Sequence, residues 1–278
     1  MSDPVVSTEW LAARLGVPDL RIVDATLPLV GQPGQGRDSY EAGHIPGAVF
    51  FDINAIADTT TDLPHMLPAA EAFGRMAGTL GLTPDATIVV YDTHGIYSAP
   101  RVWWTLRIMG YPKVFVLDGG LKAWRAEGRP VETQTVVPTA GHAVVDFNPA
   151  LIADLDDVTR VLAKGSAQIV DARSSARFRG EVAEPRTSLR SGHMPGALNV
   201  PFNEVVTADG TLKPVADLQK VFAGVDLGRP IITSCGSGVT AAVLALALAR
   251  LGRDDVAIYD GSWTEWGGRP DTAVVTGD

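Results

Sequence analysis

The loop around Cys235, the one cysteine in the chain, holds the residues best suited to chemistry. It follows the apolar run IITS and reads CGSGVT before a stretch rich in alanine and leucine. Glycines at 236 and 238 allow successive backbone amides to point inward, and a following helix would add the positive end of its dipole. Such a cradle favours the nucleophilic thiolate. We therefore expect Cys235 to be a group-carrying nucleophile, the alternative being a small buried hydrophobic residue.

Other chemistries of glycine-rich loops fail on spacing. A cysteine phosphatase needs an arginine six positions after the cysteine to clamp phosphate, and Ala241 stands there. The lysine of a phosphate-binding P-loop is absent. A serine-hydrolase elbow would centre on Ser237, but Cys235 and Val239 stand where it needs glycines.

The elements that position this loop belong to an internal repeat. Four landmarks recur in one order and at a nearly constant spacing, which indicates a duplication. The pairs are Asp24 and Asp171, His44 and His193, Asp92 and Cys235, and Asp118 and Asp260.

Short runs rich in valine and isoleucine alternate with helical stretches between the landmarks. This alternation predicts an α/β fold of two tandem domains, each a mainly parallel sheet flanked by helices. We assign residues 1–133 to the first domain, 134–149 to a linker and 150–278 to the second. Runs 88–91, 114–117, 231–234 and 256–259 are expected strands. Cys235 then follows the carboxyl end of a strand, where open parallel sheets place their functional crevice.

Composition narrows the class further. A net charge of -9 without a basic run argues against nucleic-acid binding. The first residues show neither a secretory signal nor a membrane span, so we expect no membrane association and a cytoplasmic location. One cysteine makes no internal disulfide, which fits a reducing compartment. No metal ligand set stands out, and we expect neither metal nor cofactor.

Three segments carry a resemblance to a known family: YEAGHIPGA from Tyr40, CGSGVTA from Cys235 and VAIYDGSWTEW from Val256. Together they resemble the two-domain rhodanese-type sulfurtransferases over essentially the whole chain. The resemblance implies two rhodanese-like domains, the first non-catalytic and the second catalytic. The neutral loop is similar to that of members using 3-mercaptopyruvate, whereas thiosulfate-using members typically carry a basic loop. The implied reaction moves sulfur through a cysteine persulfide to cyanide, a thiol or a thioredoxin-like dithiol, releasing pyruvate.

The resemblance also implies roles for individual residues. Arg177 and Arg186 match the arginines that bind the substrate carboxylate, a task suited to the planar guanidinium fork. The loop residues Gly236, Gly238, Val239 and Thr240 are expected to contact substrate.

Asp38, His44 and Ser237 match a proposed proton relay, with aspartate orienting histidine and histidine addressing the hydroxyl. An alternative gives His44 a structural role, because the turn motif GH[IM]PG recurs around His193.

Two other functions remain open. The first is a thiosulfate:cyanide sulfurtransferase on the same fold. The second is a non-enzymatic module that binds sulfur or serves as a regulatory platform for partners.

Overall fold

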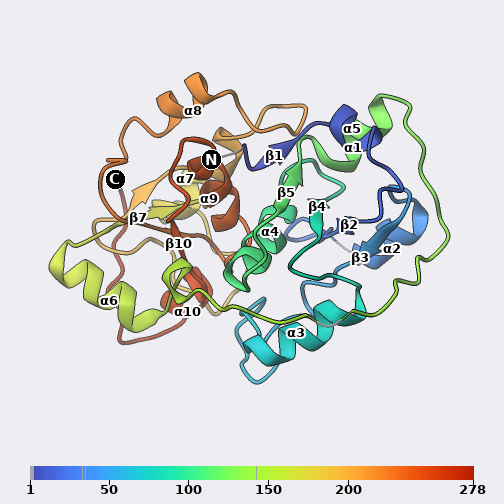
Figure 1. Cartoon of the computed structure of the whole chain (residues 1–278). Helices are drawn as coiled ribbons and strands as arrows, with labels where there is room; N and C mark the ends of the chain where they lie inside the picture. The colour runs from blue at the N-terminus through green and yellow to red at the C-terminus, as the bar shows by residue number, and fades with distance from the viewer. Residues whose placement is uncertain (1–2, 33, 35, 142) are drawn as a thin grey trace. The chain divides into compact units, whose positions relative to one another are not determined.

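The computed structural model describes residues 3–32, 34, 36–141 and 143–278. The chain divides into two compact units. The first comprises Met1–Thr59, Leu67–Pro149 and Val206–Leu212, and the second comprises Thr60–Met66, Ala150–Val205 and Lys213–Asp278. Each half of the sequence thus contributes a short segment to the unit built mainly from the other half. In Figure 1 the colour runs by residue number, so the helices and strands of the first unit are blue to green and those of the second are yellow-green to red.

The first unit holds a parallel sheet with the strand order β1-β5-β4-β2-β3. Its strands are β1 (Val5–Val6), β2 (Leu20–Asp24), β3 (Ala48–Phe50), β4 (Thr87–Tyr91) and β5 (Val114–Leu117). Its helices are α1 (Thr8–Ala12), α2 (Gly36–Ala42), α3 (Ala70–Thr79), α4 (Ala99–Ile108) and α5 (Gly120–Ala126).

The second unit repeats this arrangement with the order β6-β10-β9-β7-β8. Its strands are β6 (Ile152–Ala153), β7 (Gln168–Asp171), β8 (Leu198–Asn199), β9 (Ile231–Ser234) and β10 (Ala257–Tyr259). Its α-helices are α6 (Leu155–Lys164), α7 (Ser175–Phe178), α8 (Val215–Val221), α9 (Ala241–Arg250) and α10 (Ser262–Trp266). Short 3-10 helices lie at η1 (Pro149–Leu151) and η2 (Phe202–Glu204).

The predicted α/β fold with two mainly parallel sheets is confirmed. Each strand of the first sheet has a counterpart at the same place in the second, so β4 and β9 are equivalent. These two strands pair on both edges and are buried, which explains why TIVVY and IITS contain no charged residue. Helix α9 is apolar nearly all round because eight of its residues are buried.

The segment that we expected to be a linker, residues 134–149, is grouped with the first unit. It packs closely on α3, where the Gly141 amide donates to the Gly78 carbonyl over 2.9 Å. A Cβ added at Gly78 would lie 2.6 Å from the Gly141 carbonyl oxygen, so a glycine is needed at position 78 for this approach. The segment is therefore held by backbone contacts along one face of the helix.

Candidate functional site

Cys235 directly follows β9 and is only 2% exposed. Ser237 is half-buried, and Gly238 adopts a left-handed conformation with φ of 76°. Thr240 precedes the first turn of α9. The loop therefore turns sharply from a central strand into a central helix, as the glycine spacing predicts, with its thiol near the carboxyl edge of the sheet.

Ser262, at the start of α10, holds the cysteine loop through its side-chain hydroxyl. The Ser262 hydroxyl accepts hydrogen bonds from the amides of Cys235 (3.2 Å) and Gly238 (3.1 Å), and donates to the Tyr259 carbonyl over 2.8 Å. Ser262 itself has a φ of 49°, a left-handed conformation that is energetically unfavourable for serine and marks a constrained position. Two amides of the expected cradle are thus engaged by the protein.

The other amides of the loop are those of Gly236, Ser237, Val239 and Thr240. Among the residues that the structure describes, no acceptor is seen for these four N–H groups. They lie beside the thiol at the N-terminus of a buried ten-residue helix. This is an arrangement that stabilises negative charge on sulfur.

Helix α10 fixes the loop carbonyls. The Trp263 amide donates to Cys235 over 2.9 Å, while Thr264 donates to the Gly236 carbonyl from its amide (2.9 Å) and its hydroxyl (2.6 Å). Burial raises the pKa of Tyr259 far above its usual range, so its phenol stays protonated and donates to Glu265 over 2.8 Å. The segment DGSWTEW is therefore a support for the cysteine loop.

Both arginines expected to bind a carboxylate lie against this loop. A Cβ added at Gly236 would lie 3.3 Å from Nη2 of Arg177, so the guanidinium directly adjoins the loop backbone. Nη1 of Arg186 donates to the Thr264 hydroxyl over 3.4 Å, and that hydroxyl in turn bonds the Gly236 carbonyl. Both side chains are partly exposed. The two cations thus converge near Gly236 from different segments.

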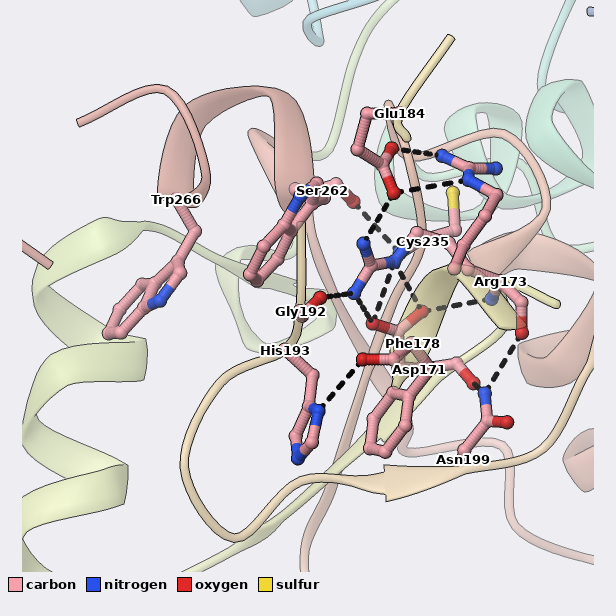
Figure 2. A network of polar contacts seen from close by, with 12 residues as sticks. Asp171, Arg173, Phe178, Glu184, Gly192, His193, Asn199, Cys235, Ser262 and Trp266 are labelled. Atoms are coloured by element: carbon pink, nitrogen blue, oxygen red, sulfur yellow. Dashed lines mark hydrogen bonds and ion pairs between the residues drawn. The ribbon is translucent and has the colours of Figure 1, made fainter. Parts of the chain in front are cut away.

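A buried network of charges lies behind Arg177. Figure 2 draws Arg173 between the carboxylates of Asp171 and Glu184, with Cys235 close by. Glu184 also accepts from Arg177. Neither Arg173 nor Glu184 was among the site residues predicted from the sequence. Their spacing alone does not reveal that they pair.

Ser237 has a histidine partner, His65, that was not among the residues predicted from the sequence. Nδ1 of His65 lies 3.1 Å from the Ser237 hydroxyl oxygen, within hydrogen-bond distance. His65 belongs to the segment Thr60–Met66 of the second unit and has φ of 64°, which is unusual for a histidine. The only sequence signal is the position of a histidine between Pro64 and Pro68 in a segment without regular periodicity.

His44 has the environment of a structural residue. It is fully buried, its ring stacks on Tyr40 at 3.8 Å, and Nδ1 lies 2.8 Å from the Tyr40 carbonyl. His193 repeats each feature with Phe178, at 3.7 Å and 2.8 Å. Each histidine also forms an isolated antiparallel bridge, His44 with Glu132 and His193 with Val275. This shared geometry favours the structural interpretation of the GH turn.

Asp38 is an exposed residue in the first turn of α2. The relay of Asp38, His44 and Ser237 stays a prediction. Within the first unit His44 contacts the Tyr40 carbonyl, and within the second unit Ser237 contacts His65.

In the first unit, the loop equivalent to that of Cys235 is occupied by its own carboxylate. Asp92 is fully buried and accepts five backbone amides at 2.9 to 3.1 Å. The donors are His94, Gly95, Tyr97, Ser98 and Ala99. The loop at the start of α4 therefore binds an anion that belongs to the chain itself.

Comparison with known proteins identifies the family to which the chain belongs. The family model of the rhodanese-like domain matches residues 7–127 and again residues 154–269. The chain therefore belongs to the rhodanese family, with two rhodanese-like domains in tandem. No described helix is both long enough and apolar enough to cross a membrane.

Individual relatives are similar over nearly the whole chain. The 3-mercaptopyruvate sulfurtransferase of Escherichia coli K12 is 46% identical over 97% of this chain and 96% of its own length. The mitochondrial thiosulfate/3-mercaptopyruvate sulfurtransferase 1 of Arabidopsis thaliana is 44% identical over 98% of this chain and 78% of its own length. The crystal structure of the E. coli 3-mercaptopyruvate sulfurtransferase SseA matches with a TM-score of 0.87, 44% identity, and coverage of 94% and 99%.

Proposed function

We propose that this protein is a 3-mercaptopyruvate sulfurtransferase that carries sulfur as a persulfide on Cys235. The observation that carries the proposal is an uncharged cysteine loop with two arginines, Arg177 and Arg186, converging near Gly236. A 2-oxo acid has its carboxylate at a distance from its sulfur. Cations beside the loop suit such a donor better than cations within it.

The first half-reaction forms the persulfide. The Cys235 thiolate attacks the sulfur of 3-mercaptopyruvate, and a sulfur–sulfur bond forms as the carbon–sulfur bond breaks. The electron pair of the broken bond goes to carbon, giving the enolate of pyruvate, which takes up a proton and leaves. The amides of residues 236, 237, 239 and 240 stabilise the charge on the sulfur.

The proton for the enolate comes from Ser237 and His65 in this proposal. Their hydrogen-bond distance of 3.1 Å allows the imidazole to exchange a proton with the hydroxyl, which stands two residues from the reacting sulfur. His65 replaces His44 in this role because His44 is buried against Tyr40.

In the second half-reaction, a thiolate or cyanide attacks the outer sulfur and restores the Cys235 thiolate. We propose a reduced dithiol protein of the thioredoxin type as one acceptor. A carrier with a single cysteine has no second thiol to remove the outer sulfur internally. A reducing compartment such as the cytoplasm suits both partners.

Mass spectrometry of the intact protein tests the first half-reaction. After exposure to 3-mercaptopyruvate without acceptor, we expect one added sulfur atom and one pyruvate released per chain. Cys235→Ser should show neither. A wild-type protein that gains no sulfur and releases no pyruvate would overturn the proposal and favour a non-enzymatic module.

The donor is tested by steady-state rates with 3-mercaptopyruvate and thiosulfate, using cyanide as acceptor. We expect a higher kcat/KM with 3-mercaptopyruvate, and a much larger loss for this donor than for thiosulfate in Arg186→Ala. A clear preference for thiosulfate would assign the chain to the other donor.

A further inference from the structure

Glu184 is a buried carboxylate that bonds two arginines at once. Its side chain is 1% exposed. Oε1 accepts from Nη1 of Arg173 over 3.0 Å and from Nε of Arg177 over 3.2 Å, while Oε2 accepts from Nη2 of Arg177 over 2.5 Å. The contact with Arg177 is therefore a two-point fork, which fixes direction as well as distance.

Glu184 is itself anchored to the central sheet. Arg173 is fully buried and donates to both carboxylate oxygens of Asp171, the last residue of β7. It also donates to the Gly192 carbonyl over 2.8 Å, and its guanidinium lies 4.1 Å from the centre of the Trp263 ring. The rigid end of a strand thus determines where Glu184 lies.

The exposure of these side chains changes abruptly at Arg177. Asp171, Arg173 and Glu184 are at most 1% exposed, whereas Arg177 is 22% exposed. The charges alternate along the series, so each buried ion has an opposite neighbour. Arg177 is therefore the one member of this set of four that a small molecule in solvent can reach.

The fork uses a specific edge of the Arg177 guanidinium. Glu184 occupies the side formed by Nε and Nη2. The opposite edge, formed by Nη1 and Nη2, has no acceptor among the described residues, and Nη2 lies beside Gly236 of the cysteine loop. A guanidinium held on one edge presents the other edge to a carboxylate in a fixed orientation.

We propose that Glu184 is a positioning residue for the sulfur donor, holding Arg177 so that its remaining edge binds the carboxylate of a 2-oxo acid beside Cys235. This inference rests on the proposed function. It adds that the selectivity of the site depends on a buried residue that does not touch the donor.

The test is Glu184→Gln, which keeps the shape and removes the charge. Glutamine has one acceptor oxygen, so its amide group would face an arginine donor and the fork would be lost. We expect KM for 3-mercaptopyruvate to rise on the order of tenfold or more, because a charge-assisted hydrogen bond is broken. The reaction of the preformed persulfide with cyanide, which needs no carboxylate contact, should keep the wild-type rate.

The matched control is Glu181→Gln, from the same segment. Glu181 is exposed and pairs with Arg179 at 2.6 Å, so its loss should leave KM unchanged. If wild type does not use 3-mercaptopyruvate, the proposed function fails. If wild type uses it and Glu184→Gln has the wild-type KM, only the inference about Glu184 fails.

A double-mutant cycle separates positioning from general damage. Added to Arg177→Ala, the Glu184→Gln change should raise KM little further, because the residue that it positions is gone. Equal effects in both backgrounds would overturn the proposal. If Glu184→Gln does not fold, Glu184→Asp serves instead: its shorter side chain cannot reach both arginines, and a wild-type KM for this variant would also overturn the proposal.

Discussion

His65 and Ser237 are separated by 172 positions in the sequence, yet Nδ1 of the histidine lies 3.1 Å from the serine hydroxyl oxygen. The segment that carries His65, Thr60–Met66, packs as part of the second unit although it belongs to the first half of the chain. The cysteine loop therefore contacts a histidine from outside its own repeat.

His65→Gln should lower kcat with 3-mercaptopyruvate about 100-fold, because a positioned acid–base group typically contributes that much. His44→Gln provides the comparison. It should lower the free energy of unfolding by about 2 kcal/mol through lost ring packing on Tyr40, and leave kcat close to wild type. Steady-state kinetics and urea denaturation of both variants check this. The reverse pattern would restore the relay through His44.

Gly236→Ala should raise KM for 3-mercaptopyruvate several-fold, since its methyl group would lie 3.3 Å from Nη2 of Arg177 while Glu184 restrains the guanidinium. Gly224→Ala is the matched control in the same unit, because a Cβ there would meet no atom within 4 Å. Steady-state measurement of KM for 3-mercaptopyruvate in the two variants checks this expectation. An unchanged KM for Gly236→Ala would mean that Arg177 is not fixed against the loop.

Asp92→Asn should destabilise the protein by about 2 to 4 kcal/mol, because the asparagine amide group would face backbone donors now bound by a carboxylate oxygen. The destabilisation would be largest at the start of α4, because the negative carboxylate also interacts favourably with the positive end of the helix dipole there. Urea denaturation measures it. Asp146→Asn, at an exposed position, is the control, and equal stabilities for the two variants would contradict the expectation.

The stability of the protein should depend on pH through Asp24. Burial raises the pKa of this carboxyl above its usual 3.8, because removal from water disfavours the charged form more than the hydrogen bonds from Thr26 favour it. The folded state thus holds the proton more tightly than the unfolded state. Its stabilising contribution is complete below pH 3.8 and is lost as the pH rises through the folded pKa.

Asp24→Asn should therefore flatten the fall in the free energy of unfolding as the pH rises through that window, measured by urea denaturation from acidic to neutral pH. Asp271→Asn gives the opposite sign as a control. The hydrogen bond from Arg269 lowers the pKa of Asp271, so that carboxylate stabilises above its unfolded pKa. A wild-type slope in Asp24→Asn would show that this carboxyl does not titrate differently on folding.

Much of the fold was predictable because its signals are local. The strands 114–117 and 231–234 match β5 and β9, and α9 fills the apolar stretch after Cys235. A buried strand, a glycine-containing turn and an apolar helix each follow from neighbouring residues. The repeat then required the two sheets to share one strand order.

The site was predictable only in part. The sequence by itself determined where the candidate nucleophile Cys235 lies, because local pattern defines the position of a lone cysteine between a buried strand and a buried helix. Its role as nucleophile stays a prediction. The structure brings Arg177 and Arg186 near the same glycine of that loop. Their assigned role in carboxylate binding stays a prediction.

Only the tertiary structure decided which side chains contact one another around the cysteine loop. Ser262 bonds the loop from 27 residues away, Glu184 joins two arginines, and His65 instead of His44 contacts Ser237. Whether a histidine stacks inside a turn or faces a hydroxyl depends on side-chain burial and on contacts between distant segments. Residue type and spacing do not encode such contacts, because they arise only when the sheet and its loops are packed together.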